Sequence, residues 1–420
     1  MSGRSISTSL FLSAWVLHSL IVLLVYPLQA PMPVEYETIA TNLLEGRGFV
    51  FPLMGQTYRS FCNPVYPWLC AGVYALFGHA PLYMLLVHAL LMALLCTVVF
   101  HIGKRFNTLT GVVAAVLTMA HPGLSYYTAL WLHSLSLDAL LFGLVILGVI
   151  RLKESPSWFR AVSLGLVTAV QFHERVVIGI FILPALIWAY GPHWQGNRRR
   201  AVSGGATVVC TVCLLAAPWT IRNLLIHREF VLVMTTTGEL LWRGNNPHAT
   251  GVAFAQDGRP MFLAADPAFQ RKILSLDELG QKHAFERAAI DYIRANPWRF
   301  LSNTLNKLKI FWWFSPLTGL LYPSRFLKWY VGYYAAMLVL ALAGVWRTVR
   351  SNVRVDILVL IGMLCALLSL GQSVFYVQAK HRWAIEPFVL LFASVAMVSV
   401  RDACCRLVAW RRLPSASKPV

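Results

Sequence analysis

Long apolar segments constrain this chain more than any other feature of its sequence. About ten windows of roughly 17–20 mostly apolar residues, the length that crosses about 30 Å of hydrocarbon, recur along it. They lie near residues 8–26, 82–100, 109–128, 132–150, 161–174, 176–191, 201–218, 330–346, 355–371 and 383–400. Only 13% of the residues are charged and the mean hydropathy is +0.62, which excludes an ordinary soluble domain. The sequence predicts an all-α polytopic membrane protein with about ten transmembrane helices, whose first partner is the lipid bilayer.

Basic residues collect in alternate short loops between these segments. They are Lys104 and Arg105; Arg151, Lys153 and Arg160; Arg198 to Arg200; Arg347, Arg350 and Arg354; and Arg401, Arg406, Arg411 and Arg412. Positive charge marks cytoplasmic loops, so we expect both termini in the cytoplasm and two long connections, 27–81 and 219–329, outside. The net charge of +19 then reflects this asymmetry and attraction to anionic lipid, not a nucleic-acid partner.

This arrangement predicts three regions along the chain. Residues 1–218 form a seven-span module that includes the outer loop 27–81, residues 219–329 form an outer region, and residues 330–420 form a three-span module with a cytoplasmic tail. Both outer regions carry amphipathic helices that we expect to lie along the membrane surface.

The helices of the outer regions can be placed from local patterns. Apolar side chains in 36–44 recur at i, i+3, i+4, i+7 and i+8, and Gly46 follows as a stop. In the second outer region, 252–274 reads as irregular, and Ser275 with Glu278 predicts a capping box that starts a helix. Asn296-Pro297 predicts the end of that helix and the start of another, whose apolar stripe over 301–312 is typical of an interfacial helix.

Five basic side chains break the positive-inside trend because they lie at the outer ends of spans. They are Arg175, Arg222, Lys380, His381 and Arg382. Each taken alone is compatible with a membrane-boundary anchor, and Arg175 with a solvated ion pair in a short outer hairpin. Taken together they favour one shared anionic ligand, and the arginine geometry suits a phosphate.

Carboxylates on the same side offer acid–base chemistry. Glu35 and Glu37 are candidates for a general base that takes a proton from an acceptor hydroxyl; the alternative is a solvated helix face. Asp138, inside the fourth span, is either a structural partner or a site residue. The histidines are scattered singly and no metal-ligand pattern is present, so we expect no metal and no cofactor.

Several segments resemble, in the same order along the chain, the motifs of one known family. They are EYETIATNLLEGRGF at 35–49, NPVYP at 63–67, PWTIRN at 218–223, LWRGNNPHATG at 241–251 and RWAIEP at 382–387. Each is weak alone, but their joint order resembles the GT-C membrane glycosyltransferases that use polyprenyl-phosphate sugars. This family includes the protein O-mannosyltransferases and the aminoarabinose transferase of lipid A.

The resemblance implies an integral-membrane glycosyltransferase of a bacterial inner membrane. Its donor would be a polyprenyl-phosphate sugar, and its acceptor an extracytoplasmic lipid, glycan or protein that attacks with inversion. The donor phosphate would be held by the five basic residues, with Glu35 or Glu37 as base. Sugar or acceptor contacts would come from Arg59, Tyr66, Asn245 and Asn246, the two amides alternatively fixing the turn at 241–251.

Two positions depart from the family pattern. The Asp that the family carries a few residues before the Glu-Tyr pair aligns with Met32, and a frequent Glu aligns with Ser134. Three readings follow: Glu35 replaces the base, the acceptor is already ionised, or the protein binds the donor without transferring its sugar. A rival class is a transporter or flippase of lipid-linked saccharide, although the chain shows no inverted repeat of the kind common in transporters.

Overall fold

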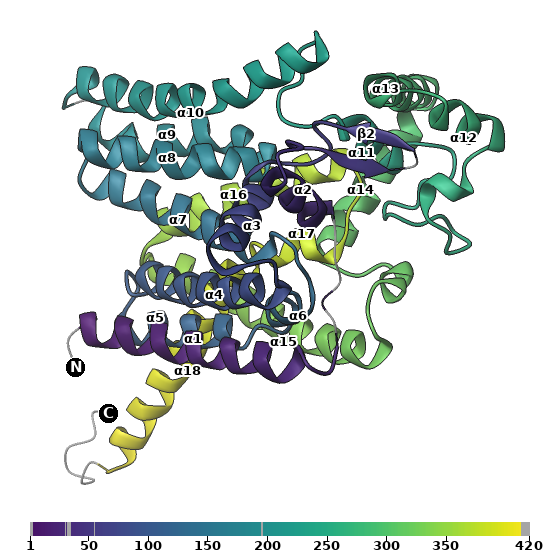
Figure 1. The fold of residues 1–420 in the computed structure, drawn as a ribbon. Coiled ribbons are helices and arrows are strands. Elements are labelled where there is room, and N and C mark those ends of the chain that lie inside the picture. Colours follow the sequence, from purple (N-terminus) through teal and green to yellow (C-terminus); the bar gives the residue numbers. More distant parts are fainter. Residues whose placement is uncertain (1–2, 30, 32–34, 54, 195, 413–420) are drawn as a thin grey trace.

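The fold is almost entirely helical (Figure 1). The computed structural model describes residues 3–29, 31, 35–53, 55–194 and 196–412, with side chains up to residue 406. In chain order its elements are α1 (Gly3–Val25), α2 (Glu35–Leu44), β1 (Phe51–Leu53), β2 (Gln56–Tyr58), α3 (Val65–Phe77), α4 (Pro81–Gly103), α5 (Thr108–Met119), α6 (Pro122–Leu130), α7 (Leu135–Glu154), α8 (Trp158–Glu174), η1 (Val176–Ile178), α9 (Gly179–Tyr190), η2 (Gly191–His193), α10 (Arg198–His227), α11 (Thr237–Gly244), η3 (Met261–Ala264), α12 (Pro267–Leu274), α13 (Glu278–Ala295), α14 (Pro297–Trp312), η4 (Pro316–Leu320), α15 (Ser324–Ser351), α16 (Val355–Val374), α17 (Ala379–Trp383) and α18 (Glu386–Arg412).

The predicted membrane segments are all helical. Among the described residues, eight helical segments are long and apolar enough to cross a bilayer: α1, α4, α7, residues 176–193, α10, α15, α16 and α18. The pair α5 and α6, bent by 45°, provides a ninth. The remaining predicted segment corresponds to α8, which has 17 residues and packs between α7 and α10. The all-α polytopic fold class is therefore confirmed.

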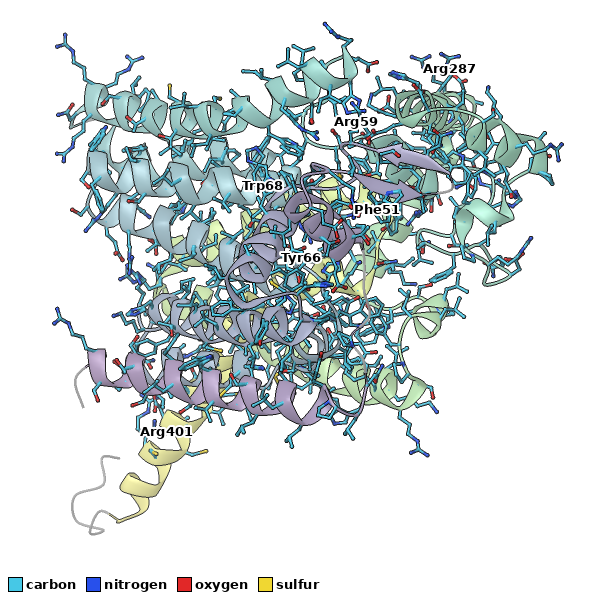
Figure 2. All side chains as sticks on the ribbon, viewed as in Figure 1. Phe51, Arg59, Tyr66, Trp68, Arg287 and Arg401 are labelled. Carbon is cyan, nitrogen blue, oxygen red and sulfur yellow. The ribbon has the colours of Figure 1, made fainter. Side chains whose placement is uncertain are left out.

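The basic loops meet at one end of the helix bundle. Arg105 pairs with Glu154 at 2.9 Å and accepts, through its backbone carbonyl, a hydrogen bond from Arg354 at 3.1 Å. Lys153 pairs with Asp356 at 2.9 Å. The start of α1 lies at the same end in Figure 1, and Arg401 lies there in Figure 2. The alternate loops thus share one face, which we predict to be cytoplasmic.

The helices differ in how much of their surface faces the bilayer. The apolar window of α7 is 83% buried, whereas that of α10 is 11% buried. Helix α7 is therefore central and α10 is peripheral. Close packing of α15 on α18 depends on Gly344, because a Cβ at this position would collide with the backbone carbonyl of Phe392.

The first outer region begins with the predicted helix and continues with a hairpin that was not predicted. Helix α2 covers Glu35–Leu44 and ends before Gly46, whose φ of 75° is left-handed, so both the helix and its stop are confirmed. Strands β1 and β2 then pair antiparallel, with Phe51 opposite Tyr58. Figure 1 shows α2, β2 and α11 to α14 away from the end of the molecule where α1 begins.

Three details of the second outer region differ from expectation. The N-cap of α13 is Asp277, which accepts from the Gly280 amide, so the capping box on Ser275 is wrong. Residues 252–274 are not irregular throughout, because they contain η3 and α12. Helix α10 continues to His227 through Pro218, so the boundary placed at 218 lies inside a helix. The predicted break between α13 and α14 at Asn296-Pro297 is confirmed.

Candidate functional site

Lys380 lies at the centre of the polar groups at the outer end of the bundle. It is carried by α17, the short helix before α18, and its Nζ lies 3.1 Å from His133 Nε2 in the loop between α6 and α7. Burial lowers the pKa of Lys380 to about 8, and the Glu35 carboxylate opposes that shift. The ammonium is thus cationic at neutral pH, although the side chain is partly buried.

Arg175 reaches the same region from the end of α8. Its guanidinium lies 2.6 Å from the Asp138 carboxylate, which also accepts a 2.7 Å hydrogen bond from Gln171. The Arg175 and Asp138 side chains are 18% and 2% exposed, so the alternative of a solvated ion pair in an outer hairpin is wrong. Glu174 is also buried, and the Asn63 amide donates to its backbone carbonyl at 2.6 Å.

Arg243 is a third cation that the sequence analysis did not single out. It lies in α11, pairs with Glu239 one turn earlier, and stands 5.0 Å from the ring centroid of Tyr376. Burial alone would lower the pKa of Arg243, but Tyr376 and the Glu239 carboxylate raise it above its usual value. The available signal was a basic residue inside the turn-rich segment LWRGNNPHATG.

We call Arg175, Arg243 and Lys380 the outer cation site. They come from segments separated by 68 or more positions in the sequence, yet the charges of Arg175 and Arg243 both act on Lys380. His133 and His381 lie beside them, and burial together with the charges of Arg175 and Lys380 lowers their pKa values well below 6.5. Both imidazoles are therefore neutral at pH 7, and they contribute hydrogen-bonding groups instead of charge.

Glu35 faces the outer cation site, whereas Glu37 does not. Burial raises the pKa of Glu35, and the charges of Lys380 and Arg243 oppose that rise. Glu37 instead accepts hydrogen bonds from Tyr74 at 3.3 Å and His79 at 3.1 Å, on the α3 side of α2. The neighbouring departure from the family pattern, Met32, lies outside the described residues.

Edge-to-face aromatic contacts hold α2 beside the site. Tyr36 packs edge-on against Tyr66 at 5.0 Å and against His133 at 5.8 Å between ring centroids. Tyr66 is fully buried, and its hydroxyl lies 2.6 Å from His88 Nε2. Tyr66 therefore supports the helix that carries Glu35 from within the protein, and it presents no open surface to a sugar.

Arg222 belongs to a second polar cluster. It donates to Ser60 Oγ and Asn223 Oδ1, both at 2.9 Å. Its guanidinium carbon lies 4.5 Å from the ring centroid of Trp219, in a cation–π contact. Its charged neighbours are Glu278 and Arg59, not members of the outer cation site. Arg59 is exposed beside this cluster, and its backbone amide donates to Glu278 at 2.6 Å.

Arg382 is fully buried, and its guanidinium is paired with groups inside the protein. It pairs with Glu386 at 2.5 Å and donates to the backbone carbonyls of Phe311 at 2.8 Å and Trp313 at 3.2 Å. Glu386 also accepts from Tyr330 at 2.6 Å. The structure thus brings Lys380 and His381 to the outer cation site and directs Arg382 into the core between α14, α15 and α18.

The segment at 241–251 is locked to the bundle by its amides. Asn245 Nδ2 donates to the Leu241 and Val374 carbonyls, both at 2.8 Å, and Asn246 Nδ2 donates to the Trp242 carbonyl at 2.8 Å. Both asparagines are 1% exposed. Of the two roles considered, fixing the turn is therefore the one that the geometry supports.

Lys307 completes this connection from α14. Its fully buried ammonium donates to Asn245 Oδ1 at 3.1 Å and to the carbonyls of Gly244 and Val374, each at 3.3 Å. A Cβ on Gly244 would collide with the carbonyl of Phe375. We call Gly244, Asn245, Lys307 and Val374 the loop junction, because they join α11, α14 and α16.

Metal-binding potential is the remaining chemistry to place. In the part of the chain that the structure describes, no three His, Cys, Asp or Glu side chains are grouped so as to hold a metal ion. The groups that do converge are three cations, two neutral imidazoles and the carboxylate of Glu35. This combination suits a phosphate-bearing ligand and one proton transfer.

Comparisons with known proteins agree with this architecture. Residues 62–221 match the family described as dolichyl-phosphate-mannose-protein mannosyltransferase. No curated protein matches the chain. The oligosaccharyltransferase of Archaeoglobus fulgidus, solved with a tethered acceptor peptide, has a TM-score of 0.53 at 13% identity, covering 97% of this chain and 51% of that one.

Two structures of ArnT from Cupriavidus metallidurans are also similar. The complex with undecaprenyl phosphate has a TM-score of 0.43 at 13% identity, covering 98% of this chain and 81% of that one. The apo form has a TM-score of 0.39 at 15% identity, with 95% and 80% covered. At such identities the likeness concerns the fold, and the oligosaccharyltransferase is the comparison on which the fold assignment depends.

Proposed function

Because this chain has the GT-C membrane fold, we propose that it is an integral-membrane glycosyltransferase that uses a polyprenyl-phosphate sugar as donor. One observation carries the proposal. Arg175, Arg243 and Lys380, from three distant segments, share one electrostatic environment at the outer end of the helix bundle, and the charges of Lys380 and Arg243 act on the Glu35 carboxylate.

The three cations fit the donor phosphate. An arginine guanidinium can donate two parallel hydrogen bonds to two oxygens of one phosphate, and a lysine ammonium adds a compact positive charge. When the sugar leaves, the phosphate gains negative charge, so cations fixed in a poorly hydrated site stabilise the transition state more than the ground state. Lys380 and Arg175, both partly buried, meet this requirement.

Glu35 is the proposed base. The acceptor hydroxyl attacks the anomeric carbon from the face opposite to the phosphate, and its proton passes to a Glu35 carboxylate oxygen. The bond between the anomeric carbon and the phosphate oxygen breaks, and its electron pair leaves with polyprenyl phosphate, so the configuration inverts. Burial raises the pKa of Glu35, which strengthens it as a base, while Lys380 and Arg243 limit that rise and favour the ionised form.

The experiment uses the purified full-length protein in lipid nanodiscs with a radiolabelled polyprenyl-phosphate sugar. We expect Arg175→Ala and Lys380→Met to weaken donor binding, and Glu35→Gln to preserve binding but slow transfer. Arg287→Ala, an exposed arginine on α13 away from the site, is the matched control. Unchanged sugar transfer by all three site variants would show that these residues do not form the active site.

The same material separates the rival functions. In sealed proteoliposomes, movement of donor across the bilayer without a glycoside product would support a flippase instead. Donor binding with neither movement nor product would support a binder. Unchanged rates in Glu35→Gln together with losses in Arg175→Ala would indicate an acceptor that is already ionised.

We also propose that the protein lies in a bacterial inner membrane with both termini in the cytoplasm. The grouping of basic loops at the end that carries the N-terminus supports this orientation. An epitope inserted at the Asp257-Gly258 turn is expected to be reached by antibody in intact spheroplasts. A C-terminal epitope is expected to be reached only after lysis, and the opposite pattern would overturn the orientation.

A further inference from the structure

A cavity opens beside the outer cation site. It has a volume of about 380 Å³ and is enclosed by the β1–β2 hairpin, α11, η3 and α13. Its apolar wall consists mainly of Leu53, Phe61, Phe262, Leu263, Ile273 and Phe285. We call it the outer apolar pocket. Its volume lies within the range of pockets that bind small organic groups.

The polar side chains in the wall are already paired within the protein. Tyr58 donates to Gln281 at 2.5 Å, and Thr236 donates to the Phe61 carbonyl at 2.9 Å. Glu278 accepts from Thr235 at 2.6 Å and from the backbone amides of residues 59 and 60. Lys282 pairs with Glu286 at 3.3 Å. These bonds fix the shape of the pocket. Because its polar groups are already paired, contacts with its aromatic and aliphatic side chains determine which ligand binds.

Arg243 and Glu239 belong to both the pocket and the outer cation site. Both line the pocket, and both act electrostatically on Glu35. A molecule whose apolar group fills the pocket would therefore have its adjoining atoms beside Arg243, whose charge acts on the proposed base. Such a position is suited to an acceptor, because the cations on the other side are assigned to the donor phosphate.

The pocket lies beyond the ends of the membrane-spanning helices. Its lining residues belong to the outer segments and to none of the membrane-spanning helices. Figure 1 shows β2, α11 and α13 together at the outer end, and contacts join α13 to both α11 and β2. An acyl chain would have to extend beyond the ends of the membrane-spanning helices to enter, whereas a side chain of a polypeptide outside the membrane would not.

We propose that the outer apolar pocket binds an aromatic or branched aliphatic side chain of a polypeptide acceptor and so positions a neighbouring Ser or Thr hydroxyl near Glu35. The hydroxyl's role rests on the proposed function, but binding in the pocket does not. The pocket is thus a specificity site, and it selects peptides with an apolar residue next to the hydroxyl.

The test measures binding without turnover. Purified full-length protein in nanodiscs is photolabelled with a short peptide that carries benzoylphenylalanine next to serine, and the labelled residues are mapped by mass spectrometry. We expect labelling at Phe61, Phe262 or Phe285, competed by excess Phe-Ser peptide but not by Asn-Ser peptide. Binding of undecaprenyl phosphate is measured separately on the same samples, so a failure of the donor site is recognised independently.

Two variants provide the controls. Leu263→Asp places a charge in the pocket wall, and Leu274→Asp places the same charge on an exposed leucine of α12 outside the wall. We expect labelling to fall at least 10-fold in the first and to stay unchanged in the second. Equal labelling in both, labelling confined to the membrane helices, or capture of a photoactivatable phospholipid in place of the peptide would overturn the proposal.

Discussion

The guanidinium of Arg175 lies 2.6 Å from the carboxylate of Asp138, which joins the end of α8 to the first turn of α7. Asp138 is almost fully buried, and its other oxygen accepts from Gln171. The pair fixes the arginine at the outer end of the bundle while it still contributes to the field around Lys380. Asp138 therefore positions a cation of the proposed phosphate site.

Replacing Asp138 with Asn should destabilise the protein by about 3 kcal/mol, since breaking a buried ion pair strands the remaining charge. This value is at the low end of the usual loss for a broken buried ion pair, about 3–5 kcal/mol. The reason is that the Arg175 side chain is 18% exposed, so water can partly solvate its charge. The double variant Asp138→Asn, Arg175→Met should recover part of the loss. Unfolding of the detergent-solubilised protein measures both, and additive losses would show that the pair is not coupled.

Donor affinity should depend on pH through Lys380. Its pKa of about 8 lies below the usual 10.5, so the ammonium is present below pH 8 and is lost as the pH rises through that value. We expect the affinity for undecaprenyl phosphate to fall between about pH 7.5 and 9. Lys380→Met should bind more weakly at pH 7 and lose this dependence, whereas an unchanged profile in the variant would assign the dependence to another group.

Glu35→Gln should slow transfer by about 10²–10⁴-fold, the usual contribution of a positioned base. Donor binding should be retained, because Gln keeps the size of the side chain. Glu37→Gln is the matched control on the same helix, and its activity should change little because Glu37 faces Tyr74 and His79. Equal losses in the two variants would argue for a general role of α2 instead of a base at Glu35.

Arg382→Met should cost about 3–5 kcal/mol of stability, because it leaves Glu386 buried without its cation. The fraction that remains folded should bind undecaprenyl phosphate with unchanged affinity. Arg325→Met removes an exposed arginine at the start of α15 and should leave stability nearly unchanged. A specific loss of phosphate affinity in folded Arg382→Met would instead place that guanidinium at the donor.

Gly244→Ala should destabilise the loop junction by about 1–3 kcal/mol, because the added methyl group meets the Phe375 carbonyl and backbone has little room to move. Gly332→Ala is the control, since a Cβ there meets no neighbouring atom within 4 Å. Thermal unfolding of both variants measures the difference. Equal stability of the two would show that the junction is pliable.

The membrane architecture was predictable because span length and loop charge are local properties. Helix α2 and the break at Asn296-Pro297 followed from patterns within a few residues. The β1–β2 hairpin was missed because each strand has only three residues and Pro52 interrupts the pattern. The cap of α13 was placed two residues early, because Asp277 and Ser275 both suit an N-cap and only the backbone distinguishes them.

The candidate site was predictable only in part, because a charge near a membrane boundary looks the same in sequence whatever it contacts. Arg175 and Lys380 share an electrostatic environment, whereas Arg222 is bound to Ser60 and Arg382 to Glu386. Arg243 was not predicted because its position over the ring of Tyr376, which precedes α17, depends on how α11 is placed in the folded chain. Such convergence is a tertiary property that spacing along the chain does not encode.

The loop junction has a consequence for how a large lipid could reach the interior. Lys307 binds three acceptors on two other segments, and the Val377 amide donates to the Gly251 carbonyl at 2.9 Å. Hinging the outer segments away from the bundle would break these bonds together and strand a buried ammonium. A long prenyl tail is therefore expected to slide in sideways from the bilayer between neighbouring helices, while the covering segments stay shut.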